Sequence, residues 1–354
     1  MQNANKGEDN SMLLKHLKQQ MLLPVEEYII NKAVNIRGTE VLLLSFTVEK
    51  DKNSLWVLYE NHNLNDDSCD EEYHEEFYTE REEMTTNREE FLHHIKESHR
   101  QKYFHIKDME MQGNIIRFGS STSSPIYDRN IEGKMHLQHF VEKGLISEEW
   151  DEKRLENLVI ARYDQMEDEE LPKIDKTKEL SVVLRIDRDI REVAIQHPFV
   201  VKFGKQDIGT KVTYYDEALE KESYFFIDEI YSYDPYEDIL EKSKQIEDPE
   251  ERENMIQHIT KALETVCPKG KKLAVIKYET EDETQLRFVM KDYLEAKPVH
   301  SCSSIGFICK NDEIGINGYK LKECVMQSID KDFNGELEIE LFSKYVEIPE
   351  ETVY

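Results

Sequence analysis

The sequence predicts an α+β fold with largely antiparallel sheets and flanking helices, divided between two domains. The length of 354 residues exceeds that of one average domain and suggests two. Stretches with strand patterns lie before and after a pair of helices, without the regular alternation of strand and helix that builds parallel sheets. Hydrophobic residues make up 38% of the chain, with only 13 Gly and 9 Pro, and this composition excludes disorder over the whole length.

A charged stretch marks the expected boundary between the domains. Residues 167–170 are all acidic, Pro172 follows them, and helical periodicity ends there. The expected organisation is a disordered polar tail (1–11), an α+β domain (12–165) with an acidic helical insertion (66–101), a charged linker (166–179), a β-rich α+β domain (180–349) with a two-helix insertion (234–267), and a tail (350–354).

Two hairpins are expected between helical segments in the first half of the chain. Strand-forming residues dominate 40–50 and 55–61, and a second hairpin joins 103–111 to 114–119 through Gln112-Gly113. The serine-rich run 120–125 has the composition of a loop. Helical spacing predicts helices over 12–31 (interrupted by Pro24), 66–90 (around a loop at 85–87), 134–143 (ending at Gly144) and 147–165 (with Ser147 as N-cap).

In the second half, Asp234-Pro235 and Asp248-Pro249 are the clearest helix starts. Each Asp supplies an acceptor for the unpaired N–H groups of the first turn, and each Pro occupies the first helical position. The second of these helices is expected to end at Val266. Strands are expected at 180–187, 193–203, 211–215, 223–231, 273–278, 285–294, 305–310, 319–329 and 337–346.

The charge balance narrows the classes of partner. Lys and Arg total 46 against 75 Asp and Glu, which gives a formal net charge of −29. Broad nucleic-acid binding and docking on anionic membranes both need clustered Lys and Arg, so neither is expected. An acidic surface instead suits a basic protein partner.

The sequence also carries expectations about location. No secretory leader pattern is visible, and apolar runs such as 41–44 are far shorter than the ~20 residues that span a bilayer. Five cysteines without C-x-x-C spacing are expected to be reduced thiols. We therefore expect a cytoplasmic protein, and the Lys-, Glu- and Ile-rich usage is typical of AT-rich bacterial or phage genomes.

Residues 330–336 match the first half of a calcium-binding loop. Oxygen ligands stand at its first, third and fifth positions and Gly at the sixth, but the twelfth position is Leu341 instead of Glu. The alternative is a hairpin that turns at Asn334-Gly335 and sets acidic residues opposite one another, where they are solvated or share a cation. The candidate ligands for Ca²⁺ or another divalent metal are Asp330, Asp332, Asn334 and Glu338.

Histidines gather between residues 62 and 105 and suggest a second metal hypothesis. Two Glu-x-x-His pairs there would each place a carboxylate and an imidazole on one helical face, as in di-iron bundles. Such bundles need four long helices, and a Glu three residues before a His is expected by chance in so acidic a stretch. The histidines are therefore either structural or part of a transition-metal site at Glu71, His74, Glu90 and His93.

A short motif supports a nuclease hypothesis. Asp128 precedes Glu132-Gly133-Lys134, and a pair of carboxylates with a Glu-x-Lys segment can hold Mg²⁺ and activate water. That chemistry needs Glu-x-Lys on a buried strand, whereas here it precedes an amphipathic helix. The catalytic candidates are Asp128, Glu132 and Lys134, and no G-x-S-x-G or phosphate-binding glycine loop accompanies them.

Tyrosines and carboxylates alternate between residues 214 and 238. Tyrosine offers a large amphipathic contact area, and carboxylates would steer a basic partner onto such a surface. In the alternative interpretation the rings fill the sheet core while the acids face water. The candidate partner-binding residues are Tyr231, Tyr233, Tyr236, Asp228 and Asp234.

The leading hypothesis is a non-catalytic, acidic interaction or regulatory protein that binds a basic protein partner, as immunity proteins and accessory proteins of phage–host conflict do. No cofactor is expected for this function. One alternative is a metal-dependent hydrolase or nuclease with an unrecognised carboxylate/His site. Another is a phage or bacterial assembly component, which would form a large defined oligomer.

Overall fold

The structure is a computed structural model, and it describes residues 14–50, 52–61, 84–100, 103–127, 130–178, 180–299 and 313–354. By its internal contacts the chain divides into two compact units. The first comprises residues 1–78, 100–189 and 349–354, and the second comprises 79–99 and 190–348. Helices flank mostly antiparallel sheets, in agreement with the predicted α+β class.

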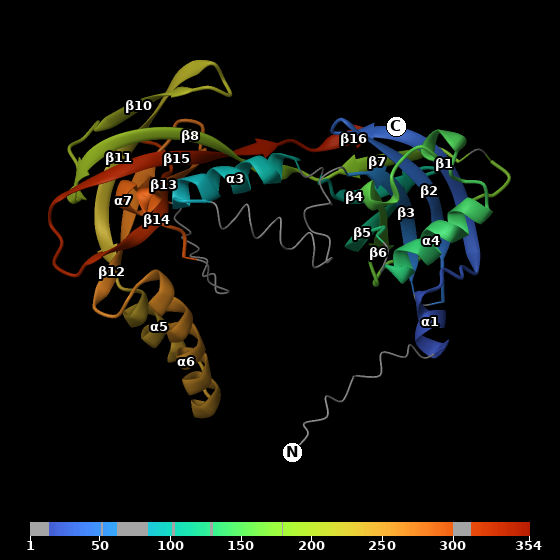
Figure 1. Cartoon of the computed structure of the whole chain (residues 1–354), viewed down its shortest axis with the longest axis horizontal. Helices are drawn as coiled ribbons and strands as arrows, with labels where there is room; N and C mark the ends of the chain where they lie inside the picture. The colour runs from blue at the N-terminus through green and yellow to red at the C-terminus, as the bar shows by residue number, and fades with distance from the viewer. Residues whose placement is uncertain are drawn as a thin grey trace. The chain divides into compact units, whose positions relative to one another are not determined.

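One eight-stranded sheet forms the framework of the first unit. Its strands are β1 (Glu26–Ile36), β2 (Thr39–Val48), β3 (Asn53–Glu60), β4 (Ile106–Met111), β5 (Asn114–Pro125), β6 (Leu158–Gln165), β7 (Val182–Ile186) and β16 (Glu351–Val353). They follow the order β1-β2-β3-β6-β5-β4-β7-β16. Because the end strands β1 and β16 lie beside each other, the sheet curls almost into a barrel (Figure 1).

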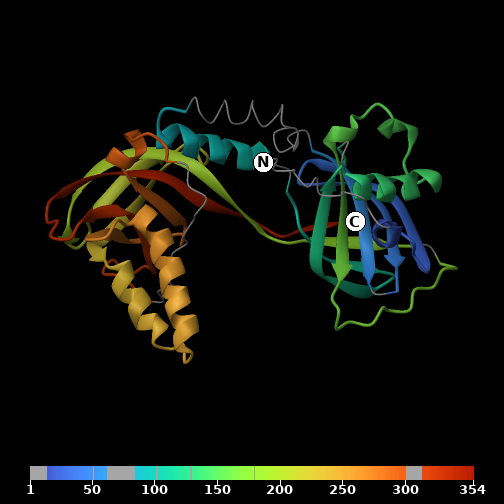
Figure 2. The same cartoon turned by 60° about the horizontal axis from the view of Figure 1, so that its bottom comes forward.

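Apolar side chains fill the inside of the curled sheet and also cover part of its outside. The inside holds large rings such as Phe46, Tyr59 and Tyr163. On the outside, α4 (Ile131–Glu142) lies across the sheet and packs Phe140 against Trp56 (Figures 1 and 2). Among the described residues, the other helical segments of this unit are α1 (Leu14–Gln20), η2 (Glu148–Trp150) and η3 (Leu155–Asn157).

Arg37 holds together the two segments at which the chain leaves the first unit, near residue 189, and returns to it, at residue 349. Its guanidinium donates hydrogen bonds to the carbonyl oxygens of Asp187 (2.5 Å) and Pro349 (3.3 Å), and its backbone N–H reaches the Glu351 carboxylate at 3.3 Å. Arg37 and Gly38 have φ of +49° and +79°, which suits the two-residue turn between β1 and β2.

The second unit is a pair of packed sheets. Its strands are β8 (Asp189–Lys202), β9 (Gly204–Lys205), β10 (Lys211–Asp216), β11 (Lys221–Tyr233), β12 (Lys271–Glu279), β13 (Gln285–Met290), β14 (Leu321–Asp330) and β15 (Glu336–Ile348). One sheet has the order β10-β11-β12-β14 with β9 added to β11, and the other has the order β13-β15-β8. Phe225, Tyr278 and Phe288 lie in the core between them.

Helices cover the second unit at two places. They are α3 (Asn87–Arg100), α5 (Pro235–Ser243), α6 (Pro249–Val266) and α7 (Lys291–Glu295). Ile95 of α3 packs against Phe342, and Arg88 pairs with the Glu340 carboxylate at 2.6 Å. Helices α5 and α6 pack against each other as a projecting pair (Figure 1).

Several predicted elements are confirmed. Both hairpins form, β2 with β3 and β4 with β5, and the second turns through Gln112 and Gly113 at φ of +50° and +80°. Asp234 and Asp248 cap α5 and α6, and each side chain accepts two backbone N–H groups. Helix α6 ends at Val266 as expected.

Two predictions fail along β5 and β6. The helix predicted over 147–165 is wrong, because 158–165 forms β6 between β3 and β5, where strand pairing on both sides outweighs the local helical periodicity. The loop predicted at 120–125 is also wrong, since these residues continue β5 and pair with β6. The helix predicted over 12–31 is wrong beyond Gln20: helix α1 ends there, before Pro24, and residues 26–31 belong to β1, which pairs with β2.

The hairpin predicted after Asp330 is wrong as well. Strand β14 pairs with β12, whereas β15 pairs with β13 and lies beside β8, so the turn carries the chain from one sheet to the other. Leu337, Ile339 and Leu341 then face the core between the sheets. The strand predicted over 285–294 ends at Met290, and 305–310 lies outside the described residues.

The two compact units divide the chain differently from the expected organisation. Residues 166–178 form a loop within the first unit, and Leu171 and Ile174 pack against its inner core. Strands β7 and β16 follow this loop and complete the curled sheet, so residues 350–354 include a paired strand. Helix α3 packs in the second unit. The tail 1–11 and residues 66–83 of the predicted insertion lie outside the described residues.

In the part of the chain that the structure describes, no helix is both long enough and apolar enough to cross a membrane.

Candidate functional site

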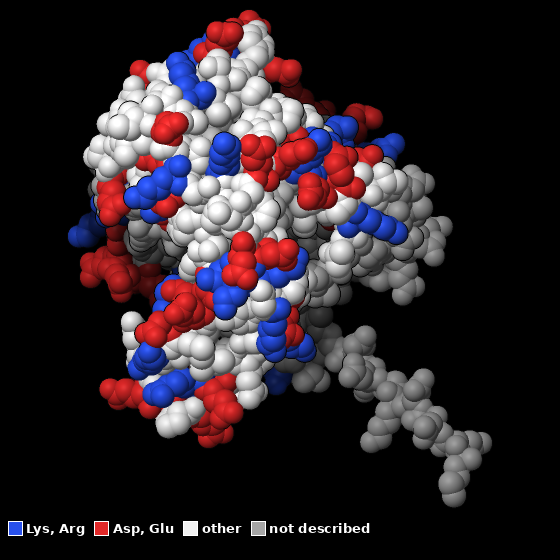
Figure 3. Space-filling model, turned by 90° about the vertical axis from the view of Figure 1, so that its left-hand side faces the viewer, with Lys and Arg blue, Asp and Glu red and all other residues white. Residues whose placement is uncertain are grey.

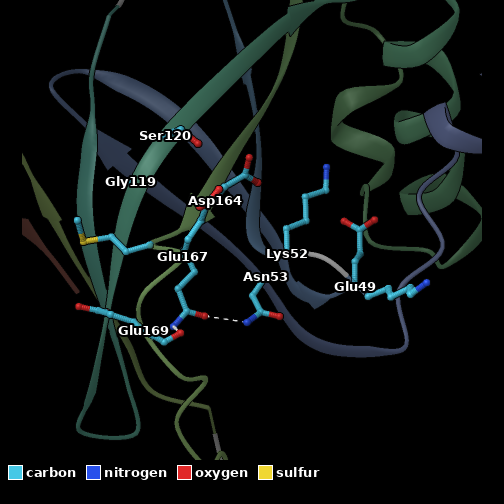
Figure 4. Close-up of a pocket in the computed structure, with 11 residues that line it drawn as sticks. Glu49, Lys52, Asn53, Gly119, Ser120, Asp164, Glu167 and Glu169 are labelled. Atoms are coloured by element: carbon cyan, nitrogen blue, oxygen red, sulfur yellow. Dashed lines mark hydrogen bonds between the residues drawn. The ribbon is translucent and has the colours of Figure 1, made fainter.

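A polar groove lies on the first unit where β3, β5 and β6 meet the turns at their ends (Figure 4). It has a volume of about 590 Å³. Asp164 of β6 lies opposite Ser54 of β3 and Ser120 of β5, so these three side chains share one face of the sheet. The groove is lined by Glu49, Lys50, Lys52, Asn53, Gly119, Ser120, Asp164, Gln165, Met166, Glu167 and Glu169.

Carboxylates outnumber ammonium groups in this groove. Glu49 comes from the turn after β2, and Glu167 and Glu169 come from the acidic loop 167–170 after β6. In the view of Figure 4, Asp164 lies between Ser120 and the Lys52 side of the groove. The groove therefore presents a net negative lining to a ligand.

Gln165 holds the acidic loop in place. This buried side chain accepts a hydrogen bond from Asn53 Nδ2 at 2.9 Å, the dashed line in Figure 4. Its Nε2 donates to the carbonyl oxygens of Glu169 (3.3 Å) and Glu170 (3.4 Å). The Gln165 amide thus connects the first residue of β3 to the loop after β6, so both walls of the groove are held by the same side chain.

The same loop is fixed to β5. The Met166 N–H donates to the Arg117 carbonyl oxygen at 2.9 Å. Between Phe118 and Ser120 the register of β5 against β6 shifts, which leaves Gly119 in a bulge. A Cβ on Gly119 would lie 3.4 Å from Met166 Cγ, so the loop lies close against this glycine.

The groove carboxylates differ in their accessibility. Asp164 accepts a hydrogen bond from Ser54 Oγ at 2.6 Å and lies 2.9 Å from Arg162 Nε. Glu169 lies 2.6 Å from Arg117 Nη1, but that arginine side chain is 59% exposed. The exposed Glu167 makes no hydrogen bond or ion pair with any residue that the structure describes. Glu167 is therefore open to a ligand, whereas a ligand cation at Asp164 or Glu169 would share the carboxylate with an arginine of the chain.

The arrangement favours binding over covalent chemistry. The Ser54 hydroxyl is fully buried, so its bond to Asp164 holds the carboxylate and does not expose a nucleophile. Beside the groove, Arg162 lies over the Trp56 ring, which also contacts His136. Burial, with the nearby Arg162 charge, lowers the pKa of His136 to about 4, so this imidazole is neutral near pH 7.

A second polar cluster lies in the second unit around Glu279, which is fully buried. Its carboxylate accepts hydrogen bonds from the backbone N–H groups of Asn317 (2.9 Å) and Tyr319 (2.8 Å) and from Asn317 Nδ2 (2.8 Å). Burial, together with the neighbouring Glu279 carboxylate, raises the pKa of Asp228 to about 6. The donors around Glu279 lower its pKa despite burial, so a proton shared by the pair stays on Asp228.

The metal and catalytic candidates from the histidine-rich and Glu-x-Lys segments are dispersed. Glu132 and Lys134 lie in the first turn of α4, where Glu132 is exposed. On α3, Glu90 lies 3.9 Å from the imidazole of His94. His93 lies on the same helix, next to His94 in the sequence. Among the described residues, no group of three His, Cys, Asp or Glu side chains could hold a metal ion. Glu71, His74 and Asp128 lie outside the described residues.

The candidate calcium ligands lie on the turn between β14 and β15. Asp332 and Asn334 are exposed there. Asp330 lies 3.6 Å from Lys271 Nζ, and Glu338 lies 2.7 Å from Lys291 Nζ. In this arrangement two of the four candidate ligands have lysine as their neighbour.

The tyrosine-rich candidates are built into the second unit. The hydroxyls of Tyr233 and Tyr236 donate to Asp238 Oδ2 (2.7 Å) and the Cys267 carbonyl oxygen (2.6 Å). Asp234 caps α5, Asp228 pairs with Glu279, and Lys277 lies over the Tyr231 ring. On the face drawn in Figure 3, basic and acidic side chains are interspersed.

Sequence analysis did not identify the groove, because its walls come from three separate stretches of the chain. The only part of the groove that stands out in the sequence is the acidic run 167–170, and its charge and the nearby proline indicate a linker instead. Comparison with protein-family models, with curated proteins and with solved structures found no match for this chain. The groove is therefore interpreted from its own geometry and charge.

Proposed function

We propose that this chain is a non-catalytic interaction protein whose first unit binds a basic segment of a partner protein in the groove. The observation that carries the proposal is the open, negative lining: Glu167 and Glu169 stand on the rim beside Asp164. The net charge of −29 favours the same class of partner, because long-range attraction accelerates encounter with a basic surface. Basic toxins and nucleic-acid-binding proteins both belong to that class.

The physical basis of affinity would be several weak contacts acting together. An exposed ion pair contributes little, about 0–1 kcal/mol, so one rim carboxylate would not hold a partner. Three or more carboxylates around one concave surface can engage successive Lys or Arg side chains. Because Gln165 anchors both walls, the groove is preorganised and loses little entropy on binding.

The test compares two double variants of equal charge. Glu167→Gln/Glu169→Gln removes rim charge, and Glu148→Gln/Glu149→Gln removes two exposed charges of η2 in the same unit. The probe is a fluorescently labelled, capped peptide of alternating lysine and valine, and binding is followed by anisotropy at low and moderate salt. The rim variant should bind about tenfold more weakly with a smaller salt dependence, and the η2 variant should bind like the wild type.

Two results would count against the proposal. Equal weakening by both double variants would show that the peptide senses overall charge and not the groove. Tight binding of a glutamate–valine peptide of the same length would show that the groove does not select basic ligands. Thermal unfolding of each variant, with a midpoint close to that of the wild type, ensures that a loss of binding does not reflect a loss of fold.

A further inference from the structure

Among the described residues, strand β5 has no paired strand on one of its sides over 118–125. Its pairing with β4 ends at Arg117, whereas its pairing with β6 continues from Phe118 to Pro125. Among the described strands, none pairs with the other side of β5 over 118–125. Residues 119–123 are exposed, so alternate backbone N–H and C=O groups of this segment face solvent.

Between the bulge at Gly119 and Pro125 at its end, this edge lacks the features that normally block strand addition. Such edges usually carry charge, proline or strong twist. The segment 119–124 has no charged residue and no proline. By contrast β8, at the edge of a sheet in the second unit, carries Arg191, Glu192 and Pro198 and a residue at positive φ, Gln196 at +60°.

The open edge and the acidic groove adjoin each other. Gly119 and Ser120 belong to both, since they line the groove and lie on the edge strand. The hydrogen bond from Met166 N–H to the Arg117 carbonyl oxygen holds the acidic loop at the end of this edge. A segment laid along β5 would therefore run past the groove rim.

We propose that the basic partner segment binds as an added β-strand along residues 120–124 of β5, with its lysine or arginine side chains reaching the groove carboxylates. This inference rests on the proposed function and names its mode of recognition. Backbone hydrogen bonds to β5 supply affinity that is independent of sequence. Glu167, Glu169 and Asp164 select a basic segment over a neutral or acidic one.

The first test uses the peptide itself. The lysine–valine peptide is compared with the same peptide N-methylated at every residue, which keeps the charge and the side chains but cannot enter a β-ladder. The N-methylated peptide is expected to bind about tenfold more weakly or worse. Equal affinity of the two peptides, still weakened by Glu167→Gln/Glu169→Gln, would overturn strand addition and leave the groove function standing. Binding by neither peptide would overturn both.

The second test uses a pair of neighbouring prolines in the chain. Because N–H groups alternate along a strand, one of Ser121→Pro and Thr122→Pro removes an outward donor and the other removes a bond to β6. The variant with the smaller loss in thermal stability is the one with the outward proline. It should lose peptide binding, and retention of wild-type affinity by that variant would contradict the proposal.

Discussion

Three carboxylates of the second unit and two of the first lie in contrasting surroundings. In the second unit, Asp216, Glu279 and Glu340 are buried, and each faces a specific partner within the fold. In the first unit, Glu167 and Glu169 stand on the rim of an open groove. A buried carboxylate is tolerated only with its partners, whereas an exposed one costs little and stays available to a ligand. Whether an acidic residue stabilises the fold or stays available to a ligand therefore depends on its surroundings, which the sequence alone does not give.

The largest expected effect comes from Lys344→Met. Lys344 and Asp216 form an ion pair with side chains only 5% and 1% exposed. Removing the lysine leaves a buried charge without its partner, and we expect a loss of about 3–5 kcal/mol in the free energy of unfolding. Chemical denaturation measures it, and Asp216→Asn/Lys344→Met should recover part of the loss. A loss below about 1 kcal/mol would contradict the buried pairing.

Gly315→Ala should have the next largest effect. A Cβ at Gly315 would lie 2.2 Å from Glu279 Cδ, and that carboxylate is fixed by the backbone of Asn317 and Tyr319. Segment 313–320 would have to move, and we expect a loss of about 2 kcal/mol. The Glu279→Ala background removes the obstacle, so adding Gly315→Ala there should cost clearly less. An equal cost in both backgrounds would contradict the predicted clash.

Asp228→Asn should have a smaller effect that depends on pH. The pKa of Asp228 rises from 3.8 to about 6 in the folded chain, so the folded state holds more protons than the unfolded state between these values. Stability from this group is present below pH 3.8 and is lost as the pH rises to about 6. We expect Asp228→Asn to be more stable than the wild type by about 1 kcal/mol near pH 7.5, after allowance for solvent screening.

Unfolding curves measured across this pH range check the prediction for Asp228. The difference between variant and wild type should vanish near pH 3.8 and reach a plateau above pH 6. A difference that stays constant with pH would mean that Asp228 does not titrate in this range.

The smallest effect on stability is expected from Glu167→Gln/Glu169→Gln. The Glu167 side chain has no partner among the described residues, and Glu169 pairs with an exposed arginine. The free energy of unfolding should change by no more than about 0.5 kcal/mol. This variant therefore separates binding from folding. If this variant lost as much free energy of unfolding as Lys344→Met, the rim carboxylates would be as important for folding as the buried ones, and the contrast drawn above would be wrong.

Sequence patterns identified the elements whose causes are local. The helix caps at Asp234 and Asp248 and the turn at Gln112-Gly113 depend only on neighbouring residues, and all three are confirmed. Residues 158–165 have helical spacing but form a strand, because pairing with β3 and β5 decides their conformation. The serine-rich run 120–125 has the composition of a loop but completes β5 for the same reason.

The candidate site was hidden from the sequence for the same physical reason. Its walls at 49–53, 119–120 and 164–169 come together only when the sheet curls. No local motif encodes that proximity. The acidic run 167–170 is apparent in the sequence, but the hydrogen bonds from Gln165 that hold it at the groove are not.

The most direct test of the central claim is to map where the lysine–valine peptide binds. Amide hydrogen exchange of the full chain, measured with and without the peptide, reports this without any substitution. We expect slower exchange in segments 118–125 and 164–169 of the first unit. Slower exchange confined to 214–238, the tyrosine-rich surface suggested by sequence, would contradict it.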